Sequence, residues 1–496
     1  MVKKCLLLLL AFLLLMLGGC AEPPGASAGK IIPPSSPVRP LEGKWAVLQE
    51  LDINGDGSGA ARQGAGNEVQ FAAGAVAFGG HVWDKLSYKI KKVNTDDYLM
   101  TKYIPPAGIS VPQTRQVEVI TVHAASNYLG EFMKLDAASM IFFVQDKVLL
   151  LKKISDQADS TLVGSDTNDR DLNQDSKEGT SGVLLGLRIL EGAGYTYQTL
   201  WIAVDHYQLH PVLTSKQLFF PRTSGFWELN VQDLSAAGKT GNILTARNLA
   251  TKIPDTEKEK EGTKEKEGTG DQGDSNPALR IIDYIGNDYV AVEKKTGSVN
   301  QLQVLPVDKL SSPAEIKVSD LLGDNGLNAY LSAGEQAVAA LRGTGVTSIN
   351  SGETGENFGL VRKNGHWFLV GRINYQSGGT FAQTDFDLKV IPPPNLIFYD
   401  TLVLSWHAIK DRVPDALDAF TSPNKDIALV KTKNKLTIYP IGGEQLAENP
   451  LAELDLQEGA AVIMAEWAIG SYVESWEKSF LAYGAQALAS GSVRMR

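Results

Sequence analysis

Asp-Tyr-Val-Ala-Val at 288–292 and Leu-Gln-Val-Leu-Pro-Val at 302–307 recur later in the chain as Asp-Ile-Ala-Leu-Val at 426–430 and Leu-Thr-Ile-Tyr-Pro-Ile at 436–441. In each copy, two short apolar runs flank a polar stretch, which is the pattern of two strands joined by a turn. A recurring strand pair indicates an architecture assembled from similar small sheets. We therefore expect the C-terminal part of the chain to be mainly β.

Two further hairpins are expected in the same part of the chain. Runs at 358–361 and 367–373 meet at Asn364-Gly365, and Asn-Gly suits a type I′ turn because both central residues need a positive φ. Runs at 182–188 and 199–204 form the other candidate pair.

Ser422-Pro423-Asn424 precedes the strand at 426–430 and resembles the start of a β-propeller blade. That resemblance implies small sheets arranged radially, so that each buries its faces against its neighbours. The two matched units lie about 135 residues apart, whereas adjacent blades are about 40–50 residues apart. We therefore expect an irregular propeller-like domain over 181–480, and the alternative is an irregular pair of β-sandwiches.

Residues 41–155 form a separate region of short apolar runs with no helical period. A meander of this kind closes into a barrel to remove its exposed edges. Gly43-Lys44-Trp45 resembles the Gly-X-Trp start of lipocalin-like barrels, from which no ligand is carried over. The expected strands are 45–51, 68–71, 86–93, 98–103, 117–123, 132–135, 140–144 and 148–154.

Polar segments separate and interrupt these regions. Residues 156–180 read as an acidic linker. Residues 255–276 contain a repeated Lys-Glu-Lys-Glu-Gly-Thr and no apolar side chain in that repeat, which indicates a disordered insertion within the second domain. Few helices are expected, at 333–341 and 474–488, and residues 481–496 are expected to form a C-terminal tail.

The first residues have the layout of a secretory signal, with lysines, a short apolar run and small residues before a cysteine. The run is about 13 residues long, and a membrane-spanning helix needs about 20. Leu17-Gly18-Gly19-Cys20 resembles the lipobox of bacterial lipoproteins. The resemblance implies cleavage of 1–19, a diacylglyceryl group with two acyl (palmitate-type) chains on Cys20, and 20–40 as a flexible tether on the extracytoplasmic face. An ordinary signal peptide with a chance cysteine is the alternative.

Most of the chain also resembles uncharacterised lipoproteins of Gram-positive bacteria, which implies no activity.

Charge and cysteine content narrow the partners. Cys5 would leave with the signal peptide and Cys20 would carry lipid, so no disulfide is expected. The net charge of −10 argues against nucleic acid and against adsorption to anionic lipid, so the membrane is reached through Cys20.

Asp52, Asn54 and Asp56, followed by Gly57, match the start of a calcium loop. Position 12 of that loop is Gln63 in place of the usual glutamate, and the flanks read as strands. A strand-loop calcium site and a solvated turn are the two interpretations. No other cofactor is expected.

Three other patterns are interpreted as structural. The alternating Asp169, Asp171, Asn173 and Asp175 belong to the acidic linker. His206 and His210 lack the helix and glutamate of a zinc-protease motif. Aromatic residues within apolar strand patterns are assigned to the core, namely Trp201, Trp227, Trp367, Trp406 and Trp467.

No catalytic constellation emerges, and no catalytic residue is assigned. The leading hypothesis is a binding or scaffold protein of the cell envelope, with an envelope protein or polysaccharide as its partner. One alternative is a hydrolase of cell-wall or extracellular carbohydrate, which would need two facing carboxylates about 5–10 Å apart. The other alternative is an N-terminal barrel that binds an apolar small ligand.

The lipidation hypothesis predicts that Cys20→Ser abolishes lipid labelling. The substituted protein should leave the membrane fraction of a bacterial host, because the lipidated thiol is removed and with it both acyl chains. Metabolic labelling with a fatty acid and cell fractionation measure this, with Cys5→Ser as the matched control. Lipid labelling retained after Cys20→Ser would contradict the hypothesis.

Overall fold

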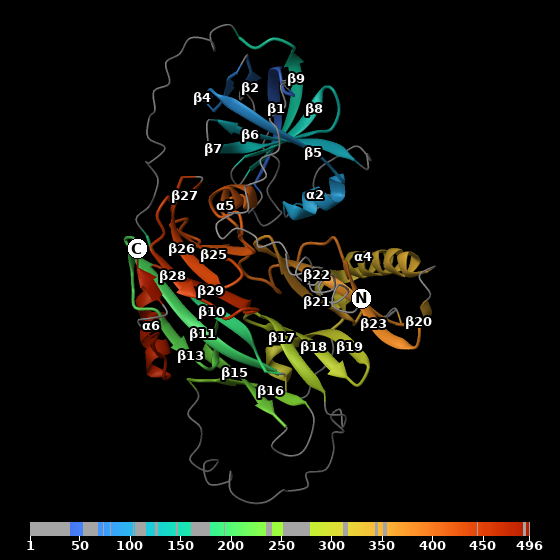
Figure 1. Cartoon of the computed structure of the whole chain (residues 1–496), viewed down its shortest axis with the longest axis vertical. Helices are drawn as coiled ribbons and strands as arrows, with labels where there is room; N and C mark the ends of the chain where they lie inside the picture. The colour runs from blue at the N-terminus through green and yellow to red at the C-terminus, as the bar shows by residue number, and fades with distance from the viewer. Residues whose placement is uncertain are drawn as a thin grey trace, which may run out of the picture.

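The computed structural model describes residues 40–495 with gaps, the longest at 53–67, 105–115, 160–178 and 251–277. Strands dominate it, as the sequence predicted. One large sheet lies at one end of the molecule, and five smaller sheets form the rest (Figure 1).

The N-terminal sheet, sheet A, is a nearly closed, barrel-like meander of nine antiparallel strands. Its spatial order is β4-β3-β2-β1-β9-β8-β7-β6-β5. Strands that follow one another in sequence are therefore neighbours in the sheet, except that β4 and β5 lie at its two ends and the last strand, β9, pairs with the first, β1. The strands are β1 (Gly43–Asp52), β2 (Glu68–Phe71), β3 (Val76–Phe78), β4 (His81–Trp83), β5 (Leu86–Val93), β6 (Val117–Ala124), β7 (Asn127–Lys134), β8 (Ser139–Val144) and β9 (Lys147–Ser155).

Sheet A buries apolar side chains on both faces. On one face Phe132 stacks on Phe142 at 4.0 Å, and Phe71 meets Phe132 edge-on at 5.1 Å. On the other face Met133 and Phe143 pack beneath a helix, α2 (Thr95–Thr101).

The expected strand at 98–103 was wrong, because residues 98–101 belong to α2 and Lys102 caps the end of that helix. The side chain of Asn94 caps the helix by accepting from the backbone N–H of Asp97 at 3.2 Å. Asp96 and Asp97 occupy the first turn, where negative charge is favourable. Tyr98 and Leu99 are buried, so helical burial outweighs the aromatic and β-favouring character of the segment.

Five antiparallel sheets make up the second unit. Sheet B contains β10 (Thr180–Glu191), β11 (Gly194–Asp205), β12 (Gln208–Leu209), β13 (Leu213–Ser215), β29 (Ala461–Ile469) and β30 (Gln486–Ala487). Sheet C contains β14 (Leu218–Arg222), β15 (Gly225–Asp233) and β16 (Asn242–Asn248). Sheet D contains β17 (Leu279–Ile285), β18 (Tyr289–Thr296) and β19 (Val299–Pro306).

Sheets E and F complete the unit. Sheet E contains β20 (Val346–Asn350), β21 (Phe358–Lys363), β22 (His366–Ser377) and β23 (Thr380–Asp387). Sheet F contains β24 (Asp418–Thr421), β25 (Ile427–Lys431), β26 (Lys435–Gly442), β27 (Gln445–Leu446), β28 (Ala452–Asp455) and β31 (Val493–Met495).

The predicted sequence repeat corresponds to the same strand pair in sheets D and F. Tyr289 pairs with Pro306 in sheet D, and Ile427 pairs with Pro440 in sheet F, at equivalent positions of the two copies. The next residue after each proline also donates to the aspartate that begins the copy: Val307 to Asp288 and Ile441 to Asp426. Both copies therefore have one register and one closing hydrogen bond.

The hairpin predicted at Asn364-Gly365 is also confirmed. Asn364 has φ of 52° and Gly365 has φ of 84°, as a type I′ turn requires. This tight turn joins β21 to β22 and brings His366 to the end of sheet E nearest sheet F.

The end of the second unit pairs with its beginning. β29 lies antiparallel to β10, so a strand near residue 465 completes the sheet that begins near residue 180. Residues 481–496, expected as a tail, contain β30 and β31, which pair with β13 and β28. Apolar clusters join sheet B to sheet F, sheet B to C and D, and sheet D to E. The radial propeller arrangement itself stays a prediction.

The remaining helices among the described residues pack against these sheets. They are α4 (Val318–Leu341), α5 (Trp406–Arg412) and α6 (Ser471–Ala482), with a short 3-10 turn η4 (Val307–Lys309). The helix expected at 333–341 is the second half of α4, which is kinked at Gly323. The insertion expected at 255–276 and most of the linker at 156–180 lie outside the described residues.

Candidate functional site

A cavity of about 300 Å³ lies between sheet A and the second unit. Figure 1 shows α2 and α5 in the space between the two parts. The lining residues from sheet A and α2 are Lys91, Tyr98, Thr101, Lys102, Tyr128 and Phe143; those from the second unit are Asn364, His366, Leu402, Leu404, Ser405, Trp406 and His407.

Helix α5 carries the second unit's aromatic side chains into this wall. Its N-cap Ser405 accepts from the backbone N–H of Ala408 at 3.1 Å, which fixes where the helix begins. Ala408 and Ile409 are buried, and Ile409 packs in the apolar cluster of sheet F. Trp406 and His407 are thereby held at the cavity.

Glu131 is the charged centre beneath the cavity. Its side chain has 0% exposure and contacts groups from both parts of the molecule. Tyr98 Oη donates to it at 2.5 Å and Thr121 Oγ1 at 3.0 Å. Lys102 and Lys91 form ion pairs with it, the latter at 3.3 Å.

The balance of burial and charge keeps this carboxylate ionised. Burial alone would raise the pKa of Glu131, but Lys102, His407 and Lys91 together outweigh it, so the pKa lies below its ordinary value. The pKa of Tyr98 is raised by burial and by the Glu131 charge, so its hydroxyl stays protonated and donates. Burial also lowers the pKa of Lys91.

His407 closes this cluster from the second unit. Its Nδ1 lies 3.5 Å from Glu131 Oε1, and its ring is stacked parallel to Tyr128 with centroids 6.2 Å apart. Burial lowers the pKa of His407 to about 4 despite the nearby carboxylate, because two lysines also face it. His407 is therefore neutral at pH 7.

Two other polar contacts cross between the parts. His123 Nε2 on β6 lies 2.9 Å from Asp411 Oδ2 on α5. Lys389 Nζ pairs with Asp97 Oδ1 on α2 at 2.7 Å. Sheet A and α2 are thus tied to the second unit at three places around the cavity.

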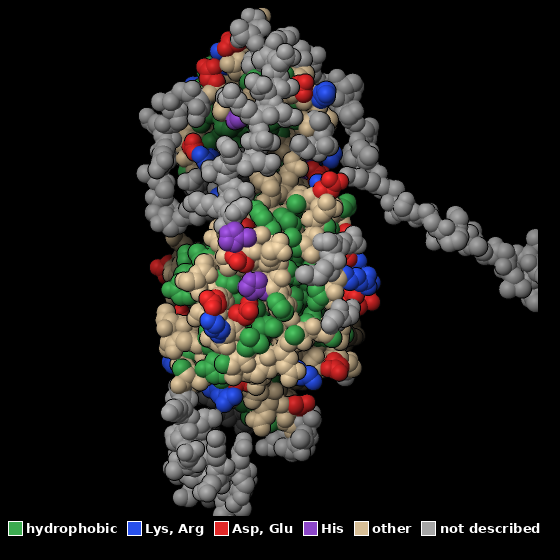
Figure 2. Space-filling model, turned by 90° about the vertical axis from the view of Figure 1, so that its left-hand side faces the viewer, with side chains coloured by type: hydrophobic (Ala, Val, Ile, Leu, Met, Phe, Trp, Pro, Cys, Tyr) green, Lys and Arg blue, Asp and Glu red, His purple; other side chains and the backbone are tan. Residues whose placement is uncertain are grey.

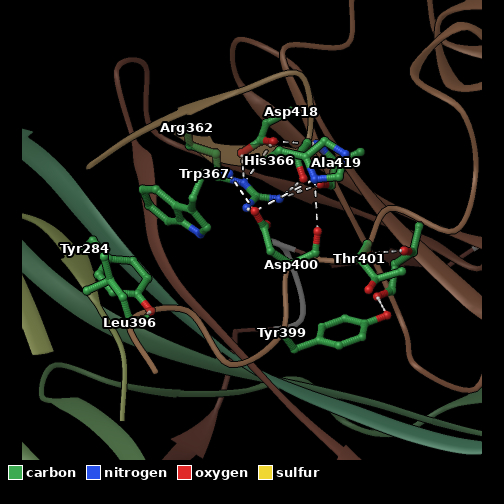
Figure 3. A network of polar contacts seen from close by, with 12 residues as sticks. Tyr284, Arg362, His366, Trp367, Leu396, Tyr399, Asp400, Thr401, Asp418 and Ala419 are labelled. Atoms are coloured by element: carbon green, nitrogen blue, oxygen red, sulfur yellow. Dashed lines mark hydrogen bonds and ion pairs between the residues drawn. The ribbon is translucent and has the colours of Figure 1, made fainter. Parts of the chain in front are cut away.

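Arg362 on β21 fixes the second unit's side of the cavity (Figure 3). Its Nε donates to Asp418 at 2.8 Å and its Nη1 to Asp400 at 3.0 Å. Its Nη2 donates to the carbonyl oxygens of Gly365 and Ala419, each at 2.8 Å. One guanidinium thus joins the β21–β22 turn to β24 and to the chain that leads into α5.

Asp400 connects this network to the cavity. It accepts from the backbone N–H of Trp367 at 2.7 Å, and its carbonyl oxygen lies 2.9 Å from His366 Nδ1. Burial would raise the pKa of Asp400, but His366 and Arg362 outweigh it and the pKa lies below its ordinary value. His366 therefore lines the cavity in a fixed orientation.

None of the site residues expected from the sequence is among the described residues that line the cavity. Cys20, Asn54 and Asp56 lie outside the described residues, as does the acidic run at 169–175. Asp52 is the last residue of β1. Among the described residues, no three or more His, Cys, Asp or Glu side chains are grouped so as to hold a metal ion.

The histidine interpretation agrees with the structure, and the tryptophan interpretation is confirmed in part. His206 lies 2.9 Å from Asp205, and His210 lies 2.8 Å from Glu477 on α6. Trp201 and Trp367 are buried, and Trp227 and Trp467 are partly buried against apolar clusters. Trp406, also assigned to the core, lines the cavity.

Sequence reasoning missed Glu131, Lys91, Lys102 and His407. The one local signal was Glu131 itself, a single carboxylate between Leu129 and Met133 in an otherwise apolar strand. Its partners are distant in sequence and carried no recognisable spacing. Comparison of the sequence with protein-family models and with characterised proteins gives no match.

The folded protein should become less stable in acid. Free His407 would take up a proton near pH 6.5 but in the fold only near pH 4, so protonation favours the unfolded chain as the pH falls across this window. Glu131 also makes the protein less stable as the pH falls below 4.5, its ordinary pKa. Its pKa in the folded protein is lower, so the unfolded chain takes up the proton first. Urea unfolding between pH 7.5 and about 4 should show a falling free energy of unfolding.

His407→Gln isolates the histidine's share of this effect. It should flatten the decline between about pH 6.5 and 4.5 and leave the decline at lower pH. His206→Gln is the matched control, because His206 is exposed, pairs with Asp205 and does not line the cavity. An identical pH profile for His407→Gln and the unsubstituted protein would refute the assignment.

Proposed function

We propose that this protein is a lipid-anchored, extracytoplasmic binding protein of the cell envelope that takes a small ligand between its two parts. The observation that carries the proposal is the cavity of about 300 Å³, whose wall is contributed by both parts. Ligand sites are typically concave, largely apolar and placed between domains, with a few fixed polar groups. This cavity has those properties.

The polar groups of the wall are held in place before any ligand arrives. Ser405 is fixed by the α5 cap, His366 by Asp400, and Tyr98 by Glu131. Groups that are already oriented lose little freedom on binding, so more of the contact energy appears as affinity.

The two other hypotheses have less support. The described residues that line the cavity include no Asp or Glu, and the Glu131 carboxylate beneath it is engaged by lysines and hydroxyls, so a pair of catalytic carboxylates is not favoured there. One face of sheet A is packed with Trp45, Phe132 and Phe142, which does not favour an apolar ligand against it.

The location rests on the sequence alone. Leu-Gly-Gly-Cys at 17–20 supports anchoring through Cys20, and the tether would carry the folded part away from the bilayer. None of the helices in the described part of the chain has the length and apolar character needed to cross a membrane.

Figure 2 shows a face on which acidic and basic side chains are scattered among apolar ones, with no broad field of one sign.

Filling the cavity should abolish binding. Thr101→Trp places a large ring at the cavity wall, and Asp96→Trp on the exposed side of α2 is the matched control. The small-molecule fraction of a bacterial envelope digest should raise the melting temperature of the unsubstituted protein and of Asp96→Trp by a few degrees. A ligand at about 100 times its Kd stabilises by about 2.7 kcal/mol. Thr101→Trp should show no rise.

Mass spectrometry of the retained ligand completes the test. An unsubstituted protein that shows no stabilisation by any fraction, or a Thr101→Trp variant stabilised as much as the control, would contradict the proposed function.

A further inference from the structure

The cavity wall has an unbalanced positive charge. Lys91 and Lys102 both line it, and the described lining residues include no carboxylate. The carboxylate that both ammonium groups contact is Glu131, which supplies a single negative charge beneath the wall. His407 is neutral at pH 7, so two cations face one anion.

The two lysines are not equivalent. Lys102 Nζ makes the closer contact with Glu131, and its side chain is 13% exposed. Lys91 Nζ lies 3.3 Å from the same carboxylate and its side chain is 38% exposed. Lys91 is therefore the cation that can turn toward a ligand without leaving Glu131 unpaired.

Aromatic and hydroxyl groups lie in the same wall. Trp406, Tyr128 and Phe143 are the aromatic side chains of this wall, and the apolar side of a ring can pack against such side chains. Ser405 Oγ accepts from the backbone N–H of Ala408 as the cap of α5, and a hydroxyl that accepts in this way can also donate its proton. Asn364, held at the type I′ turn, adds an amide. A volume near 300 Å³ is at the low end for ligand sites, which suits one ring better than a polymer.

We infer that the cavity selects a small ring-shaped ligand with one anionic group, an acid sugar, whose anion pairs with Lys91 while its ring packs on the aromatic wall. This inference rests on the proposed function and specifies its ligand. A sugar carboxylate and a sugar phosphate share this chemistry. Lysine pairs with either as a point charge, so Lys91 does not choose between them.

Calorimetry with the full-length chain in detergent tests the charge selection. Three ligands are compared. D-glucuronate carries a carboxylate and glucose 6-phosphate carries a phosphate, so they distinguish the two kinds of anion, and glucose has no charge. One anion should bind about 10–100-fold more tightly than glucose, the range expected for one charge-assisted hydrogen bond. Its affinity should fall as the salt concentration rises.

Lys91 variants test the assigned residue. Lys91→Gln should reduce the affinity for the anion about 10–100-fold and leave that for glucose unchanged, whereas Lys91→Arg should retain most of it. Lys89→Gln, two residues away on the same strand and exposed, is the matched control and should bind like the unsubstituted protein. Retained binding by Lys91→Arg shows that the fold tolerates change at this position.

Two results would overturn the inference. Equal affinity for glucose and both anions, or no binding of any of the three, shows that the cavity does not select an acid sugar. Equal loss in Lys91→Gln and Lys89→Gln shows that Lys91 is not the recognising cation. Neither result decides the proposed function, which fails if no envelope fraction stabilises the unsubstituted protein or if Thr101→Trp is stabilised as much as its control.

Discussion

The arrangement of sheet A, α2 and α5 depends on the buried Glu131 carboxylate, which must be surrounded by cations and hydrogen-bond donors. An ionised carboxylate with no exposure is costly unless cations and hydrogen-bond donors surround it. Its donors come from β5, β6, α2 and the residue that follows α2, and His407 of α5 faces it from the second unit. Glu131 supplies one negative charge, whereas two lysines, Lys91 and Lys102, lie at the wall of the cavity, so one positive charge is in excess there.

The second unit supplies a rigid counterpart. Arg362 joins two sheets and the chain leading to α5 through acceptors on four residues, so Ser405, Trp406 and His407 are positioned by buried contacts and not by a free loop. The pairing of β29 with β10 closes the unit from its far end. The cavity is therefore formed between two bodies that are each internally fixed, which is how a preformed ligand site is built.

Local patterns predicted much of the fold, and long-range contacts explain what they missed. Asn364-Gly365 and the repeat at 288–307 and 426–441 each contain their own strands and turn, so neighbouring residues were sufficient. α2 was missed because its aromatic and apolar residues follow a strand-like pattern. The helix instead depends on its cap at Asn94 and on burial against sheet A. Glu131 meets Tyr98 and Lys91 across 33 and 40 residues, and His407 from another unit, so no spacing in the sequence reveals the site.

Amide hydrogen exchange of Glu131→Gln tests most directly whether this carboxylate holds the two parts together. The substitution keeps the shape of the side chain but removes the charge that Lys91 and Lys102 pair with. The account predicts that the amides of Ile409 and Val413, which close the turns of α5 on the opposite unit, exchange faster by about tenfold or more. Glu118→Gln, a partly buried glutamate on β6, should leave them unchanged. Equal exchange in α5 for both variants would contradict the account.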